Sequence, residues 1–367
     1  MYKEIEKLNS VDSILTNLES IYSFSICKKE EGDEVVDFLR KYWRGENYCL
    51  VKSRDLFDWQ YFNKRTGTYN FVIARHKQRD EIDCIEGFIP VSMYDETNDT
   101  GYMWGSIWKT RDDIRTFGLG MAVLCYMNRI FSMSKWMAFG LSQFSISNYT
   151  SLGFECRNSE HYFLLNPTKQ KFKLCGGVEA YINKDYTGDN SFSLNECSLE
   201  EYQNINSDNE MFNAYNSFKT KDFYVNRYFK HPWYEYKAYS ISKEDVKAII
   251  FTRECKAEGA KCLRIVDYVG RHDWLESVNE KLKGLLEQNN YEYIDLIIAG
   301  ENPDVLNKAG FINKKIDENI IIPNYFEPFV KENVPMFYTY HKNCTSTVVY
   351  KADGDQDRPN FVIKRRL

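Results

Sequence analysis

The sequence contains one arrangement of predicted strands and helices twice, and this repeat constrains the fold more than any single motif. In each half of the 367 residues, strand patterns precede a segment with helical periodicity, and a further strand leads into a polar stretch that ends in Gly-Phe. The closing stretches are Leu152-Gly153-Phe154 and Ala309-Gly310-Phe311. Chance would have to produce the same order twice, so the repeat predicts two α+β domains of one design.

The first half begins with a helix and continues into strands. Val35, Phe38 and Leu39 recur at helical spacing and predict a helix over residues 33–43. A second amphipathic helix is predicted over residues 121–133. The predicted strands cover residues 70–75, 85–93, 101–108, 136–141 and 162–165. We expect strand 162–165 to close the first domain.

The second half shows the same pattern after a polar connection. Its predicted elements are a hairpin over 236–240 and 245–253, a strand over 262–269, a helix over 274–286 and a strand over 294–299. Residues 169–219 are rich in Asn and Ser and poorly periodic. The sequence therefore predicts a first domain over 1–175, a linker over 176–218, a second domain over 219–350 and a C-terminal tail over 351–367.

Composition excludes several classes of protein. A net charge of -5 argues against a nucleic-acid binder, which usually presents a basic face. No apolar stretch approaches the about 20 residues that cross a bilayer, and the N-terminus does not resemble a signal peptide. The 10 cysteines form no C-x-x-C pair, and the histidines show no metal-ligand spacing. We expect a cytoplasmic protein with reduced thiols, no metal and no membrane partner.

A glycine-containing turn between a predicted strand and helix is the sharpest local motif. It reads Arg115-Thr116-Phe117-Gly118-Leu119-Gly120. Two glycines remove side chains from the turn, so that backbone N–H groups can approach an anion at the start of the following helix. Arg115 would add a charge-assisted bond to a pyrophosphate. The alternative is a tight turn without a ligand.

These residues resemble the R/Q-x-x-G-x-G/A acyl-CoA loop of the GNAT superfamily of acyltransferases. Tyr149, four residues before Gly153-Phe154, matches the tyrosine of the family's L-Y-x-x-x-G-F element, which in many members protonates the departing thiolate. The resemblance implies two tandem GNAT-like domains, each a mixed, mostly antiparallel sheet flanked by helices, with acyl-CoA as cosubstrate. It also implies that the strand with Trp104, Ser106 and Ile107 pairs with the pantetheine arm.

The second copy departs from the family pattern at both of these places. Gly270-Arg271-His272-Asp273 stands where the acyl-CoA loop would be, and Leu306 stands where Tyr149 stood. We therefore expect the second domain to shape the acceptor site and not to bind a second CoA.

Among tandem-GNAT proteins, the chain resembles bacterial sugar N-acyltransferases. The similar stretches are KYWRGEN (41–47), FDWQY (57–61), WGSIW (104–108), HPWYEY (231–236) and DGDQDRPN (353–360). Such enzymes move an acetyl or 3-hydroxybutanoyl group from CoA to a nucleotide-linked amino sugar, such as dTDP-3-amino-3,6-dideoxygalactose. That reaction belongs to the biosynthesis of surface polysaccharide, including lipopolysaccharide O-antigen.

Amide formation from a thioester needs a neutral amine, a polarised carbonyl group and a proton for the thiolate. His231 and Glu235 are candidate bases, although each is equally well explained as a satisfied polar residue at a strand edge. An amino-sugar amine is a weaker base than lysine, so a mechanism without a dedicated base stays open. The candidate acceptor-binding residues are Trp59, Trp233, Tyr234, Asp357 and Arg358. Arg358 would pair with a diphosphate, whereas the polar composition of its segment favours a solvated loop.

Two other functions stay open on the sequence. An aminoacyl transferase of the FemX type would use charged tRNA, but the intact G-x-G turn favours a thioester donor. A non-catalytic acyl-CoA-binding protein would keep the turn without the chemistry. The sequence does not distinguish a monomer from a homodimer.

Overall fold

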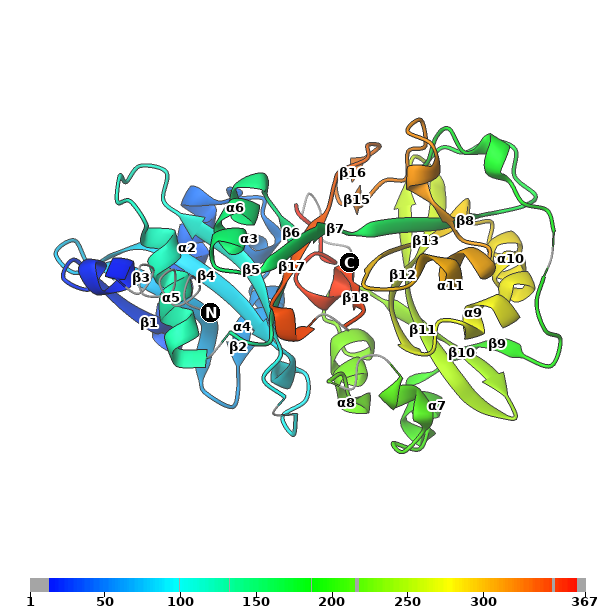
Figure 1. Cartoon of the computed structure of the whole chain (residues 1–367), viewed down its shortest axis with the longest axis horizontal. Coiled ribbons are helices and arrows are strands. Elements are labelled where there is room, and N and C mark those ends of the chain that lie inside the picture. The colour runs from blue at the N-terminus through cyan, green and yellow to red at the C-terminus, as the bar shows by residue number, and fades with distance from the viewer. Residues whose placement is uncertain are drawn as a thin grey trace. The chain divides into compact units, whose positions relative to one another are not determined.

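The computed structural model describes residues 13–98, 100–131, 133–185, 187–214, 218–344 and 347–361, which form two compact units (Figure 1). Unit 1 comprises residues 1–157, 337–345 and 354–367, and unit 2 comprises residues 158–336 and 346–353. Each unit has a mixed, mostly antiparallel sheet flanked by helices, so the predicted α+β class is confirmed.

The sheet of unit 1 runs in the order β1-β3-β4-β5-β6-β17-β7, with β2 paired to β3. The described pairs are antiparallel, except that β5 and β6 run parallel. The strands are β1 (Tyr22–Lys28), β2 (Phe62–Asn63), β3 (Thr68–His76), β4 (Glu81–Pro90), β5 (Met103–Thr110), β6 (Trp136–Leu141), β7 (Glu155–Asn158) and β17 (Phe337–Tyr340).

Helices cover this sheet and bury their apolar faces. They are α2 (Gly32–Tyr42), α3 (Cys49–Lys52), α4 (Arg54–Tyr61), α5 (Leu119–Phe131) and α6 (Gln143–Ser151). The helices predicted over 33–43 and 121–133 correspond to α2 and α5. Helix α5 buries Val123 and Met127 in a core that also holds Phe88 and Trp136 of the sheet. Ser53 starts α4, because its hydroxyl accepts a hydrogen bond from the backbone N–H of Leu56.

The sheet of unit 2 runs in the order β14-β8-β13-β12-β11-β10-β9, with β18 paired to β13. Again the two central strands, β12 and β13, are parallel. The strands are β8 (Glu160–Leu165), β9 (Ser193–Cys197), β10 (Tyr236–Lys243), β11 (Asp245–Ala257), β12 (Ala260–Gly270), β13 (Tyr293–Ala299), β14 (Ile312–Asn313) and β18 (Val349–Tyr350), besides a hairpin of β15 (Tyr325–Phe326) and β16 (Phe329–Val330).

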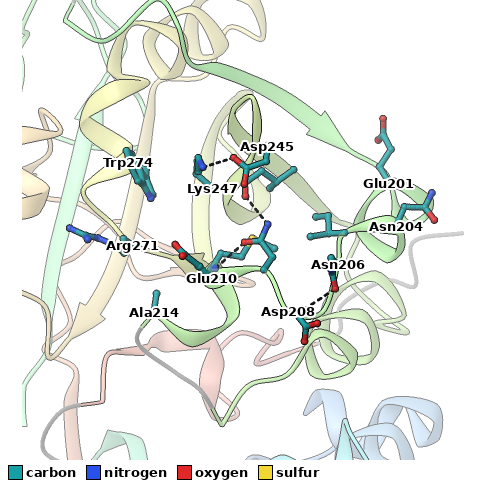
Figure 2. Close-up of a pocket in the computed structure, with 14 residues that line it drawn as sticks. Glu201, Asn204, Asn206, Asp208, Glu210, Ala214, Asp245, Lys247, Arg271 and Trp274 are labelled. Atoms are coloured by element: carbon teal, nitrogen blue, oxygen red, sulfur yellow. Dashed lines mark hydrogen bonds and ion pairs between the residues drawn. The ribbon is translucent and has the colours of Figure 1, made fainter.

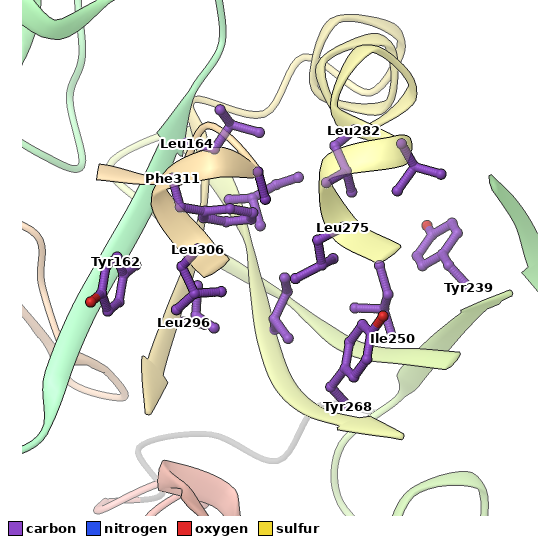
Figure 3. Packing of buried hydrophobic residues seen from close by; sticks show 14 of the residues in the cluster. Tyr162, Leu164, Tyr239, Ile250, Tyr268, Leu275, Leu282, Leu296, Leu306 and Phe311 are labelled. Atoms are coloured by element: carbon purple, nitrogen blue, oxygen red, sulfur yellow. The ribbon is translucent and has the colours of Figure 1, made fainter. Parts of the chain in front are cut away.

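The helices of unit 2 are short and pack on an apolar core. They are α7 (Leu199–Asn204), α8 (Lys221–Tyr224), α9 (Trp274–Ser277), α10 (Asn279–Gln288) and α11 (Pro303–Lys308). Leu306 and Phe311 pack with Leu296 in this core (Figure 3). The single helix predicted over 274–286 is interrupted at Val278, which leaves α9 and α10 as separate helices.

The strand that follows each repeat in the sequence belongs to the sheet of the other repeat. In unit 1, β17 pairs with the edge of β6 that faces away from β5; in unit 2, β8 pairs with the edge of β13 that faces away from β12. The expectation that strand 162–165 closes the first domain was wrong, because this strand is β8 of the second sheet. Periodicity predicts a strand but does not reveal which sheet it joins.

The predicted linker and tail both contain ordered structure. The segment 176–218 contributes β9 to the second sheet and contains α7. In the segment predicted as tail, Asp353, Asp355 and Asp357 are buried, although the composition favours a solvated loop. The unit boundaries therefore differ from those of the contiguous domains expected from the sequence. Among the described helices, none has the length and apolar character that a membrane crossing requires.

Candidate functional site

The strands β5 and β6 of unit 1 separate after a short stretch of pairing. Residues 103–105 pair with residues 136–138, after which β5 continues to Thr110 and β6 to Leu141 without pairing to each other. Opposite Gly87 of β4, the β5 strand has two residues, Ser106 and Ile107, which form a β-bulge where the separation begins. Beyond the bulge, the edge of β5 that faces β6 has no strand partner in the described part of the chain.

The predicted glycine turn lies between β5 and α5. Gly118 has φ +80°, a conformation that favours glycine, and α5 begins at the next residue. Thr116 is hydrogen-bonded to the hydroxyl of Tyr22 at 3.0 Å, whereas Arg115 is exposed and Phe117 is 93% exposed. The turn thus presents an exposed arginine beside the N-terminus of a helix, as an anion site requires.

The packing of Trp108 explains why residue 120 is a glycine, which the sequence did not reveal. A Cβ at this position would lie 3.2 Å from Nε1 of Trp108, so the indole of β5 occupies the space that we expected a ligand to need. At Gly118, a Cβ would meet Ile14 at 3.0 Å, in addition to the strain of the positive φ.

Tyr149 lies on α6 and is only 2% exposed. The indole N–H of Trp136 donates to its oxygen at 3.3 Å, which leaves the phenolic proton to be donated elsewhere. Burial, and then the charge of Glu86, raise the pKa of Tyr149 well above its ordinary value. The phenol is therefore protonated at neutral pH and suits a proton donor.

Of the three predicted residues of β5, Ser106 and Ile107 form the bulge and Trp104 lies two residues before it. The Tyr61 hydroxyl donates to Oγ of Ser106 at 3.0 Å, and the side chain of Ile107 is buried. The indole Nε1 of Trp104 is buried and has no hydrogen-bond partner among the described residues. A buried donor without a partner is costly.

The segment that follows β18 adds a buried ion pair to unit 1. Arg358 donates to Asp355 at 2.8 Å and lies over the ring of Tyr48, with 5.1 Å between the guanidinium carbon and the ring centroid. The predicted pairing of Arg358 with a diphosphate is not favoured, because Asp355 already neutralises it. Asp357 is buried. Trp59 of α4 packs on Tyr94 at a ring distance of 5.4 Å.

The other predicted residues belong to unit 2. Nδ1 of His231 accepts hydrogen bonds from the backbone N–H groups of Trp233 at 3.0 Å and Tyr234 at 2.9 Å. This nitrogen is engaged as an acceptor, so the tautomer carries its proton on Nε2 and lacks the free lone pair of a base. Glu235 is exposed. The hydroxyl of Tyr234 donates to Glu327 at 2.8 Å, and Arg253 lies 4.2 Å above its ring.

In unit 2 the chain itself fills the equivalent separation of strands. Strands β12 and β13 pair only over residues 263–265 and 294–296. Beyond this stretch, Ile298 of β13 pairs on one edge with Glu160 of β8 and on the other with Tyr350 of β18. Strand β18 therefore occupies the edge of β13 that faces β12, where the two strands have separated.

An open pocket of unit 2 is lined by residues of α7, of the start of β11 and of the segment after β12 (Figure 2). Trp274 lies on one side and Glu201 and Asn204 on the opposite side. Acidic side chains outnumber basic ones in the lining, and the basic Lys247 is paired with Asp245. The pocket is therefore a poor site for a diphosphate, and no predicted site residue lines it.

Glu86 is the residue of unit 1 that the sequence analysis missed. It lies on β4 directly before the bulge and is 1% exposed. A carboxylate inside the apolar run Ile85-Glu86-Gly87-Phe88 was the available signal, because an unpaired charge in a buried strand is rarely retained without a role. The described residues contain no group of three or more His, Cys, Asp or Glu side chains arranged to hold a metal ion.

Comparison with known proteins identifies the fold. No family model and no curated protein sequence matches the chain. A GCN5-related N-acetyltransferase from Anabaena variabilis superposes with a TM-score of 0.53 at 11% identity, covering 88% of this chain and 74% of that one. A conserved protein of unknown function from Enterococcus faecalis, described as a probable N-acyltransferase, gives 0.51 at 13% identity, covering 88% and 74%.

A third similar structure is that of Saccharomyces cerevisiae N-myristoyltransferase with bound myristoyl-CoA, at a TM-score of 0.40 and 9% identity, covering 88% of this chain and 80% of that one. The first two comparisons show that the chain has the GNAT fold. Together with the repeated sheets, they confirm the expectation of two tandem GNAT-like domains.

Proposed function

We propose that this chain is an acyl-CoA-dependent N-acyltransferase that binds its acyl-CoA in unit 1. The observation that supports this most strongly is the difference between the two repeats. In unit 1 no described strand pairs with β5 or β6 on the sides that face each other after the two strands separate, beside the turn at Gly118. In unit 2, by contrast, β18 pairs with β13 on the side that faces β12. This difference favours unit 1 as the repeat that binds a thioester substrate.

Each part of unit 1 has a defined task in this proposal. The N-terminus of α5 and the exposed Arg115 bind the diphosphate of CoA. The open edge of β5 pairs with the pantetheine arm, and a backbone N–H at the bulge polarises the thioester carbonyl. The acceptor amine attacks the carbonyl carbon, the C–S bond breaks, and Tyr149 gives its proton to the thiolate.

We further propose that the acceptor is a nucleotide-linked amino sugar, with dTDP as the nucleotide and acetyl or 3-hydroxybutanoyl as the acyl group. The support is the resemblance of the five sequence stretches to sugar N-acyltransferases. On this proposal Trp59 and Asp357 of unit 1 contribute to the acceptor site, and the enzyme acts in the cytoplasm on a precursor of surface polysaccharide. The buried ion pair of Arg358 and the engaged Nδ1 of His231 favour other residues for diphosphate binding and proton transfer.

The proposal is tested by release of free thiol from acetyl-CoA and 3-hydroxybutanoyl-CoA, with a panel of dTDP- and UDP-linked amino sugars as acceptors. We expect thiol release that requires both substrates, with a product heavier than the sugar by one acyl group. Acyl-CoA binding without thiol release would instead support a non-catalytic binding protein. Acyl transfer only from charged tRNA would support a FemX-type aminoacyl transferase.

Replacing Gly118 with valine is expected to raise the KM for acyl-CoA by about tenfold or more, equivalent to about 1.4 kcal/mol of lost binding. A β-branched residue cannot adopt φ +80° without strain, so the backbone at the start of α5 would turn away from the diphosphate. The measurement is initial rate against acyl-CoA concentration.

The matched control for this substitution is Gly67→Val. Gly67 has φ +70° in the turn before β3, and a Cβ there meets nothing within 4 Å. This variant carries a similar backbone strain far from the glycine turn in sequence. An equal rise in KM for both variants would show that the turn at Gly118 does not bind CoA.

A further inference from the structure

Glu86 of β4 is a buried carboxyl group without a full set of partners. Among the described residues of unit 1, it is the one buried carboxylate with an oxygen, Oε2, that no hydrogen-bond donor satisfies. Asp83 on the same strand is also buried, but it is paired with Arg79 and Arg111. Leaving a buried carboxylate unpaired costs stability, so its retention indicates that Glu86 serves a ligand or a reaction.

The surroundings of Glu86 belong to the proposed site. In the register of β4 and β5, Glu86 lies opposite Trp108, immediately beside the bulge at Ser106 and Ile107. The ring of Trp108 contacts Tyr149, with 5.7 Å between centroids. The titratable groups that interact electrostatically with Glu86 are Asp355, Tyr149 and Cys84. No basic group is among them.

We propose that Glu86 is the catalytic base of this site and accepts the proton that the acceptor amine loses as its nitrogen attacks the thioester. This inference rests on the proposed acyl transfer. The N–C bond forms, the electron pair of the C–S bond leaves on sulfur, Tyr149 protonates that sulfur, and Glu86 holds the proton from nitrogen. The proton passes from Glu86 to the Tyr149 oxygen before the next turnover, so the two groups return to their starting states.

The environment of Glu86 suits this role. Burial, and then the charge of Asp355, raise the pKa of Glu86 well above its ordinary value. A carboxylate of raised pKa is a stronger base and is better matched to an amine near neutral pH. Asp355 acts as a positioning residue, because its charge raises the pKa of Glu86. Arg358 holds Asp355 in place through the ion pair at 2.8 Å. His231 lacks the lone pair for this task.

The first test is the pH profile of kcat/KM for Glu86→Gln and Asp355→Asn beside the wild type. Glu86→Gln keeps the shape of the side chain, and we expect its rate to fall by about 10²–10⁴-fold. Asp355→Asn removes the negative charge that raises the pKa of Glu86, so the acidic limb of the profile should move to lower pH. The ionisation of the free amine is the same for both enzymes and cannot produce this movement.

Asp113→Asn is the control for a change of charge, because Asp113 is exposed and pairs with Arg111 in the loop before the glycine turn. It should leave the acidic limb where it is in the wild type. The inference is overturned if Glu86→Gln keeps the wild-type rate, or if Asp355→Asn leaves the limb unmoved while the wild type is active. Absence of thiol release by the wild type would instead overturn the proposed function.

The second test is thermal stability, which also verifies that the Glu86→Gln variant is folded. A carboxyl group whose pKa is raised by folding stabilises the protein below its unfolded pKa and loses this contribution as the pH rises through the folded pKa. Glutamine does not ionise, so the variant does not lose stability in this way as the pH rises. We therefore expect Glu86→Gln to melt at a higher temperature than the wild type at pH 8, with a smaller difference at pH 5. A lower melting temperature at pH 8 would show that Glu86 is a structural residue.

Discussion

Turnover by the Tyr149→Phe variant is expected to fall by about 10²–10⁴-fold, the usual contribution of a positioned proton donor. The phenol is the group of α6 that is buried, protonated and next to Trp108 at the bulge. Phenylalanine keeps the ring and its contacts with Trp108 and Phe154, so the binding of acyl-CoA should change little. It leaves the buried indole N–H of Trp136 without its acceptor, which should cost about 1–3 kcal/mol of stability. The loss should therefore appear in kcat and not in KM.

This prediction is checked by steady-state kinetics with saturating acceptor, beside the control Tyr126→Phe. Tyr126 is on α5 of the same unit, and its ring stacks on Phe24 at 5.9 Å. The control loses the same atom from the same type of residue, and it should keep the wild-type kcat. A wild-type rate for Tyr149→Phe would remove Tyr149 from the mechanism and leave the thiolate to be protonated by solvent.

Replacing Lys219 with methionine is expected to lower the free energy of unfolding by about 3–5 kcal/mol, the largest change in stability that the structure predicts. Lys219 is fully buried in unit 2, where it pairs with Asp267 at 2.9 Å and also contacts Asp353. Burial lowers the pKa of Lys219, but the two carboxylates outweigh it and raise the pKa above that of an ordinary lysine. Without the ammonium group, two buried carboxylates have no counter-charge.

Urea unfolding followed by circular dichroism measures this loss. The matched control is the triple variant Lys219→Met, Asp267→Asn and Asp353→Asn, which removes the charges together. Replacing a whole buried ionic group is often neutral, so we expect the triple variant to recover most of the lost stability. If Lys219→Met were as stable as the wild type, solvent or another cation would have to reach the two carboxylates.

Local pattern predicted the central strands of both sheets and the longer helices, but not their assembly. The helices α2 and α5 and the strands β3 to β6 follow from periodicity, because apolar residues repeat at the spacing of the buried face. Strand β8 was assigned to the wrong sheet, because pairing depends on residues far away in the sequence. The break at Val278 between α9 and α10 was missed for a similar reason, since tertiary packing sets it.

The candidate site was predictable where a motif fixes the backbone. The glycine turn and Tyr149 are defined by short local spacing, and both lie in unit 1 as expected. Asp355 was treated as part of a solvated loop, because composition does not reveal that Arg358 would neutralise it in a buried place. Glu86 was missed because it belongs to no motif; its signal is a buried carboxylate oxygen without a hydrogen-bond partner in an apolar strand.

The exchange of β8 and β17 has a consequence for synthesis on the ribosome. Domains usually fold in order as they emerge, but the first sheet here cannot be completed until residue 337 has left the exit tunnel, since β17 begins there. Until then the outer edge of β6 stays unpaired and offers its backbone to other chains. Each nascent molecule thus passes through a stage in which a chaperone that covers the unpaired edge would protect it from aggregation.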